Sequence, residues 1–95
     1  MKMYTVIAFD ISDDQRRYRV ARALESVAVR IQRSVFDGTM EEAVLLRLRS
    51  EIEGKIDTET DCVVYFRLCR ACAQRRVVVG RRYVGEEGEE PWKVI

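Results

Sequence analysis

The side chains able to do chemistry in this chain are carboxylates, arginines and cysteines, because the sequence contains no histidine. The absence of histidine excludes catalytic schemes in which an imidazole activates a serine or a cysteine. The phosphate-binding sequences GxxxxGK[ST] and GxGxxG are absent as well. What remains is carboxylate chemistry assisted by a metal ion.

Asp10 is the strongest catalytic candidate. It ends an apolar run over residues 3–9 that is typical of a buried strand, and it precedes a helix start at Ser12. Ligands often bind at this position in open α/β sheets. Asp13 and Asp14 fall in the first helical turn, where carboxylates cap a helix or complement its dipole. We therefore assign function to Asp10 and a structural role to Asp13 and Asp14, with membership of the metal site as their alternative.

A single Asp10 makes a poor magnesium site, since Mg²⁺ prefers an octahedron of oxygen ligands and keeps several waters. Two copies of Asp10 facing each other across a dimer axis would supply two carboxylates, and the cation would relieve their mutual repulsion. A chain of 95 residues also leaves much apolar surface uncovered, which favours self-association. The sequence therefore predicts a homodimer with a shared Mg²⁺ site.

The charges of the chain are unevenly distributed, although the formal net charge is only +1. Residues 15–33 and residues 67–82 each contain six arginines, whereas residues 37–61 contain eight acidic residues against three basic ones. Arginine suits phosphate because its N–H groups form paired hydrogen bonds. The two stretches therefore indicate a nucleic-acid partner, and ordinary solvated surface is the alternative.

Cysteine usage bears on both location and chemistry. Three cysteines, an odd number without a secretion signal, favour a reducing compartment. No apolar run is long enough for a membrane span, so we expect a cytoplasmic protein.

Cys69 and Cys72 form a CxxC motif, but the chain lacks the four ligands that zinc needs. A redox pair is the alternative, although such pairs favour a helix N-terminus and this motif is expected between two strands. Ordinary apolar packing is the favoured interpretation.

Hydrophobic periodicity predicts four strands and two helices. The strands are expected at residues 3–9, 29–36, 62–66 and 77–79, and the helices at residues 12–27 and 39–54. Ser12 with Gln15, and Thr39 with Glu42, would form capping boxes at the two helix starts. The order β-α-β-α-β-β is typical of an α+β, ferredoxin-like split-βαβ sandwich with two helices on one face of the sheet.

The expected domain covers residues 1–84, and the tail over residues 85–95 breaks its pattern. Residues 85–91 are acidic and contain two glycines, as a linker does, and residues 92–95 again resemble a strand. So short a strand would gain stability by pairing with a sheet edge, for example that of a second copy.

The same pattern bears on five aromatic side chains, of which it assigns three. Tyr4, Tyr65 and Phe66 are expected in the core. Phe9 and Phe36 stay open between core packing and contact with nucleic acid.

Three segments together resemble the CRISPR-associated protein two family, the small subunit of the spacer-acquisition complex. They are residues 9–20 (FDISDDQRRYRV), 29–37 (VRIQRSVFD) and 65–72 (YFRLCRAC). The resemblance spans nearly the whole chain, and the combination is specific although no single segment is. Phe9 stands where tyrosine is common in the family and cannot donate a hydrogen bond, and Asp37 stands where glutamate is common.

The resemblance implies a ferredoxin-like homodimer in which the C-terminal strand is added to the partner's sheet. It implies that Asp10 of each subunit binds Mg²⁺. The other positions tied to the nuclease site are Phe9, Arg17, Arg19, Arg30 and Phe36. Family members are metal-dependent endonucleases on single-stranded RNA or on DNA in antiviral defence. They also bridge two dimers of the CRISPR-associated integrase (protein one) and hold DNA for insertion into the repeat array.

Two other interpretations stay open beside a nuclease. The first is a non-catalytic scaffold that binds nucleic acid, with the same fold and arginines but a vestigial metal site. The second is a free-standing ribonuclease toxin of similar fold. The sequence does not decide between RNA and DNA as the preferred substrate.

Overall fold

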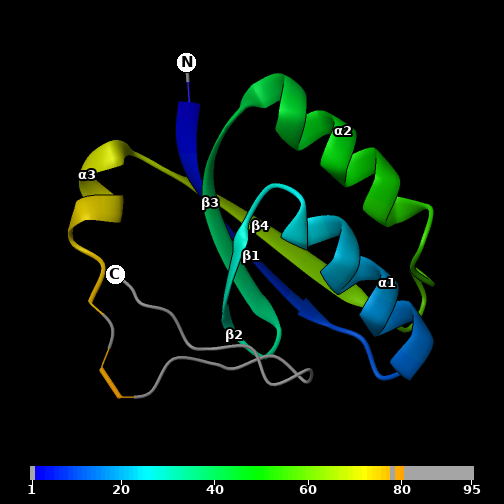
Figure 1. Cartoon of the computed structure of the whole chain (residues 1–95). Coiled ribbons are helices and arrows are strands. Elements are labelled where there is room, and N and C mark those ends of the chain that lie inside the picture. The colour runs from blue at the N-terminus through cyan, green and yellow to red at the C-terminus, as the bar shows by residue number, and fades with distance from the viewer. Residues whose placement is uncertain (1, 78, 81–95) are drawn as a thin grey trace.

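The computed structural model describes residues 2–77 and 79–80, which form a four-stranded sheet and three helices (Figure 1). In chain order the elements are β1 (Lys2–Asp10), α1 (Asp14–Glu25), β2 (Val29–Gln32), β3 (Val35–Glu41), α2 (Glu42–Glu53), β4 (Cys62–Leu68) and α3 (Arg70–Gln74). The strands lie in the order β2-β3-β1-β4, and each neighbouring pair is antiparallel. α1 and α2 lie side by side on one face of the sheet. The predicted α+β, ferredoxin-like fold is confirmed.

The core lies between the sheet and the two long helices. Side chains alternate along β1, so Ile7 and Phe9 point towards the helices while the residues between them point to the opposite face. Helical spacing brings Val20 and Leu24 of α1 into the same layer. The other large buried side chains of this layer come from β3 and α2: Phe36, Met40, Leu45, Leu48 and Ile52. Each long helix therefore turns one apolar face towards the sheet.

The prediction of one strand over residues 29–36 is wrong, because a turn at residues 33–34 divides this stretch into β2 and β3. The two strands pair with each other as an antiparallel hairpin. The alternation of apolar side chains runs on through the turn, which contains no glycine, proline or asparagine to mark it. The observed order is therefore β-α-β-β-α-β.

Both predicted capping boxes are wrong, although both helices begin near the predicted places. Asp13, not Ser12, caps α1, and its carboxylate accepts a hydrogen bond from the backbone N–H of Arg16 at 2.9 Å. Thr39 lies inside β3, since that strand stays paired with β1 as far as Glu41. Glu41 then precedes α2 without a side-chain capping bond. Sheet pairing therefore outweighs a helix cap at this position.

The prediction of a strand at residues 77–79 is wrong for the two of these residues that the structure describes. Val77 and Val79 lie outside the sheet and are 79% and 90% exposed, and residue 78 lies outside the described residues. The fourth strand comes instead from the division of the stretch after α1 into β2 and β3. The predicted domain boundary after residue 84 and the strand at residues 92–95 also lie outside the described residues.

The sheet face opposite α1 and α2, called the open face below, leaves apolar side chains exposed. Val64 and Phe66 of β4 are 39% and 50% exposed on it. Tyr4 is buried as predicted, although on the open face and not between the sheet and the helices. The prediction is wrong for Phe66, while Tyr65 on the helix side is half-buried. Phe66 is exposed because strand alternation turns it away from the helices.

The prediction that Cys69 and Cys72 pack as small apolar residues is also wrong, because both are exposed. They do not lie in a loop between two strands. The chain turns directly from β4 into α3, and Cys69 is the N-cap residue of that short helix. The short helix was not predicted.

Candidate functional site

Asp10 is the last residue of β1, where it pairs with Cys62 of β4. Since Phe9 points into the core, strand alternation puts Asp10 on the open face. Asp10 is exposed, and within the described part of the chain no hydrogen bond or ion pair engages its carboxylate. The carboxylate is therefore available to a ligand.

Arg17 fastens the loop that follows Asp10. Its guanidinium donates hydrogen bonds to the backbone carbonyls of Ile11 at 3.0 Å and Ser12 at 3.3 Å. The same guanidinium pairs with the Asp14 carboxylate at 2.5 Å. Both partners of this ion pair belong to the first turn of α1. Arg17 therefore ties the start of α1 to the residue that follows Asp10.

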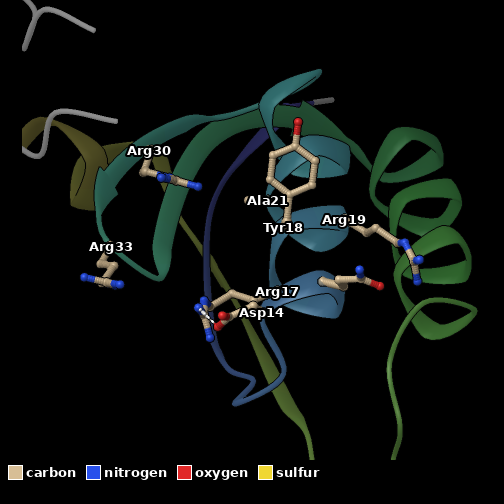
Figure 2. A pocket seen from close by; sticks show the side chains of 8 residues that line it. Asp14, Arg17, Tyr18, Arg19, Ala21, Arg30 and Arg33 are labelled. Atoms are coloured by element: carbon tan, nitrogen blue, oxygen red, sulfur yellow. Dashed lines mark hydrogen bonds and ion pairs between the residues drawn. The ribbon is translucent and has the colours of Figure 1, made fainter. Parts of the chain in front are cut away.

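A groove with a volume of about 730 Å³ runs between α1 and β2. It is lined by Asp14, Gln15, Arg17, Tyr18, Arg19, Ala21, Arg30 and Arg33. Figure 2 shows Arg17, Arg30 and Arg33 on the β2 side of α1, while the Arg19 side chain extends towards α2. Three arginines against one acid on the β2 side of α1 make this groove suited to a polyanion.

Aromatic rings support the groove. The Arg30 guanidinium lies over the Phe36 ring, 5.2 Å from its centroid, and this ring is fully buried. Phe9 packs beside Phe36 with ring centroids 6.1 Å apart. Tyr18 is 55% exposed at the groove, with the Arg22 guanidinium 5.9 Å from its ring centroid. The buried rings hold an arginine in place, whereas the Tyr18 ring is open to contact.

The structure brings together only part of the predicted site. Three predicted arginines, at positions 17, 19 and 30, share the groove, whereas Asp10 does not line it. Phe9 and Phe36 lie in the core rather than on a surface. The sequence reasoning missed Tyr18 and Arg33. The helical spacing of residues 14, 17, 18 and 21 was the signal that could have found the α1 side of the groove.

One arginine of the first basic stretch serves the fold instead. Arg16 Nε donates to Asp61 Oδ2 at 2.8 Å, and the Asp61 side chain is fully buried. The same carboxylate oxygen accepts the backbone N–H of Asp57 at 2.9 Å. The hydrogen bond from Arg16, followed by that from Asp57, holds the pKa of Asp61 below its usual value. This pair joins the start of α1 to the loop before β4.

A second polar cluster lies on the open face. The Tyr4 hydroxyl donates to Asp37 Oδ2 at 2.8 Å, and Arg76 forms an ion pair with the same carboxylate oxygen. Burial, together with the Asp37 carboxylate, raises the pKa of Tyr4. Arg76 follows α3, so its ion pair fastens this segment across the open face. Asp37 therefore already has partners, in contrast to Asp10.

The described residues contain no group of three or more cysteine, aspartate and glutamate side chains placed to hold a metal ion. A metal bound at Asp10 would therefore need ligands from outside this set, such as water or a second chain. None of the helices in residues 2–77 is long and apolar enough to cross a membrane.

The fold and its open face define a small α+β protein of the ferredoxin-like class. The chain belongs to the family described as CRISPR associated protein Cas2, whose model matches residues 3–76. The resemblance drawn from the sequence is thereby confirmed.

A named relative agrees with this assignment, and solved structures share the fold. A Chloroflexus aurantiacus protein named CRISPR-associated endoribonuclease Cas2 3 is 40% identical over 80 residues, covering 84% of this chain and 86% of that protein. The crystal structure of a hypothetical protein from Thermus thermophilus matches with a TM-score of 0.69 and 29% identity, over 97% of this chain and 100% of that chain. The Streptococcus pyogenes Cas2 structure shares the fold, with a TM-score of 0.75 and 22% identity, over 82% of this chain and 100% of that one.

Proposed function

We propose that this chain is a metal-dependent endoribonuclease that works as a homodimer, with one cleavage site formed by Asp10 of two subunits. The observation that carries the proposal is the exposed Asp10 carboxylate, without a partner among the described residues, at the end of an open sheet face. The relative from Chloroflexus aurantiacus is named an endoribonuclease, which supports this class of activity.

The open face supports the proposed dimer. An apolar sheet face exposed to water favours association, and Val64 and Phe66 lie on this one. Two such faces stacked about a two-fold axis bury these side chains. A residue near the axis meets its own copy, and in the proposed dimer the axis passes close to the end of β1, so that the two Asp10 carboxylates face each other.

A magnesium ion fits this donor set. Mg²⁺ binds carboxylate oxygens and retains waters, and the exposed Asp10 carboxylate has no competing cation among the described residues. Asp10 of each subunit would hold the ion, which supplies an activated water and stabilises charge at the phosphorus when bound. Arg17 would position Asp10, because it fixes the two residues that follow it.

The groove would bind the nucleic-acid strand. Arg30 and Arg33 would contact phosphates, and the exposed Tyr18 ring offers a surface on which a base can stack. Phe36 would act as a positioning residue, since it supports the Arg30 guanidinium. Single-stranded RNA is the substrate class, and DNA is the alternative.

A second candidate function is a DNA-binding scaffold that bridges dimers of the CRISPR-associated integrase. One observation favours it: Asp10 does not line the arginine groove, so binding does not require the residue proposed for cleavage. The two functions can coexist in one dimer.

Cleavage of single-stranded RNA and of duplex DNA, with Mg²⁺ or with a chelator, tests the main proposal. Asp10→Asn should lower Mg²⁺-dependent RNA cleavage by on the order of a hundred- to a thousandfold, because the charge that holds the ion is lost. The control Asp13→Asn should cleave normally, since asparagine also caps a helix.

Binding measured on the same samples separates the two functions. Asp10→Asn should bind RNA as tightly as the unmodified chain. An Asp10→Asn variant that still cleaves would contradict the proposed site. Tight binding without Mg²⁺-dependent cleavage in any sample would favour the scaffold instead.

A further inference from the structure

The exposed cysteine pair at the start of α3 has no role in the proposed nuclease. Cys69 and Cys72 lie three residues apart, with their sulfur atoms 3.5 Å from each other. The backbone N–H of Cys72 donates to the Cys69 carbonyl at 3.0 Å, so one closed turn holds both residues. Both side chains are exposed, which excludes the core packing expected from the sequence.

The described residues do not complete a zinc site around this pair. Zinc in a structural site takes four ligands, and the described residues bring no third cysteine, aspartate or glutamate to these two thiols. Cys62 lies at the far end of β4, seven residues before Cys69. At the rise of a strand this separation is about 23 Å, beyond the reach of a disulfide.

We propose that Cys69 and Cys72 form a thiol–disulfide exchange site whose substrates are low-molecular-weight disulfides. A disulfide has an S–S distance of about 2.05 Å, so the two sulfurs need to approach by only about 1.5 Å. Rotation of the two side chains can supply this movement within the existing turn. The reduced chain is therefore already close to the geometry of the oxidised one.

The two thiols differ in pKa, and this difference sets the order in which they react. Hydrogen bonds from the backbone N–H of Cys72, then from the Cys72 thiol and the N–H of Ala71, lower the pKa of Cys69. The hydrogen bond that the Cys72 thiol donates to Cys69, followed by burial, raises the pKa of Cys72. Because the thiolate is the nucleophile, Cys69 attacks first and Cys72 resolves.

The exchange is balanced without a further reactant. The Cys69 thiolate attacks one sulfur of a small disulfide, forms a mixed disulfide and releases the first small thiolate. Cys72 then loses its proton and attacks Cys69 Sγ, which closes the internal disulfide and releases the second small thiolate. The protein thiols are oxidised by two electrons, and the small disulfide is reduced to two thiols.

The cysteine pair and Asp10 lie at opposite ends of the sheet. Leu68, just before Cys69, pairs with Tyr4, whereas Asp10 pairs with Cys62. Asp10 lies six residue positions beyond Tyr4 in β1, or about 20 Å along the strand. The exchange chemistry is therefore separable from the proposed nuclease, and Asp10→Asn should leave it unchanged.

A redox titration of the full chain tests the proposal. The protein is equilibrated with graded mixtures of reduced and oxidised glutathione, quenched with acid and alkylated. Mass spectrometry then counts free thiols and separates internal disulfides from glutathione adducts. The three cysteines should fall to one free thiol across a single transition. The matched control Cys62→Ser should fall from two free thiols to none at the same midpoint.

Single variants test the order of reaction. At neutral pH, Cys72→Ser, which keeps Cys69, should react with oxidised glutathione faster than Cys69→Ser. The rate should be roughly threefold higher for each unit by which the pKa of Cys69 lies below that of Cys72. A lower pKa gives a larger fraction of thiolate, but a less basic thiolate is a weaker nucleophile, which partly offsets the gain. Cys72→Ser should also accumulate the mixed disulfide, because the resolving thiol is missing.

Several results would overturn the proposal. Three free thiols at every glutathione ratio would show that Cys69 and Cys72 do not form a disulfide. Disulfides between two chains, or between Cys62 and either other cysteine, would show a different pairing. An equimolar metal ion that protects both thiols until a chelator removes it would assign the pair to metal binding. Equal rates for the two single variants would contradict the order of attack.

Discussion

The end of β1 and the groove beside α1 hold their charged side chains in different ways. The Asp10 carboxylate is exposed and has no partner within the described residues. Arg17 is fastened by two backbone carbonyls and a carboxylate, and Arg30 rests on a buried ring. In the proposed function, a groove with two of its arginines held within one chain would bind nucleic acid by itself. The lone carboxylate would form a cleavage site only with a second copy.

Removing charge from the groove should affect binding most. Arg30→Ala with Arg33→Ala should weaken binding of single-stranded RNA by on the order of tenfold, because charge-assisted hydrogen bonds to phosphate are lost. The slope of log K against log salt should become shallower by about 0.7 for each lost contact. A fluorescence titration at several salt concentrations measures both values.

The control for this pair of substitutions is Arg47→Ala with Lys55→Ala. It removes the same formal charge from α2 and the turn after it, away from the groove. Its salt slope should stay near that of the unmodified chain. Equal slopes for the two double variants would place the nucleic acid elsewhere on the protein.

Phe36→Leu should have a smaller effect on binding. A cation–π contact of this kind is worth about 0.5 to 1 kcal/mol, so its loss should weaken RNA binding about two- to fivefold. The core should lose about 1 to 2 kcal/mol of unfolding free energy, since the buried volume falls. RNA titration and urea unfolding of the same preparation give both quantities.

Phe9→Leu is the matched control for Phe36→Leu. Phe9 packs against Phe36 in the same core, but no cation–π contact engages its ring in the described structure. This control should lose comparable stability and keep normal RNA binding. Equal losses of binding in both variants would show that Phe36 acts through core packing alone.

The smallest expected effect is the change in unfolding free energy with pH that comes from the Arg16–Asp61 pair. The folded-state pKa of Asp61 is lowered, so the pair stabilises the protein above the ordinary aspartate range near pH 4. That contribution is lost as the pH falls through the lowered pKa. Asp61→Asn should therefore be less stable than the unmodified chain at neutral pH, and the gap should narrow in acid.

Urea unfolding at several pH values measures this gap. Glu59→Gln serves as the control, because Glu59 lies in the same loop and its carboxylate makes no ion pair among residues 2–77. A gap between Asp61→Asn and the unmodified chain that stays constant with pH would exclude titration of Asp61 as its cause.

The parts of the fold that the sequence predicted well are those with a regular apolar period. Val20 and Leu24 on α1, and Leu45, Leu48 and Ile52 on α2, recur at helical spacing and are all buried. The β2–β3 hairpin was missed because alternation continues through residues 33–34, where no glycine, proline or asparagine marks the turn. β3 also pairs with β1 along its other edge, and local pattern does not reveal that contact.

The candidate site was predicted in part for similar reasons. Asp10 could be found from its place after an apolar run, since strand ends follow from local pattern. Arg33 and Tyr18 were missed because the groove joins α1 to β2, and that contact is tertiary. The exposure of Cys69 and Cys72 was also missed, because the short helix α3 forms where a loop between two strands was expected.

Subunit mixing tests most directly whether two Asp10 residues make one cleavage site. Unmodified and Asp10→Ala chains are unfolded together in equal amounts and refolded, so that subunits pair at random. About a quarter of the dimers then carry two intact copies, given one two-fold interface. Mg²⁺-dependent RNA cleavage should fall to about that quarter of the activity of an unmodified sample at equal total protein. A fall to only about one half would show that each subunit cleaves alone, and would contradict the shared site.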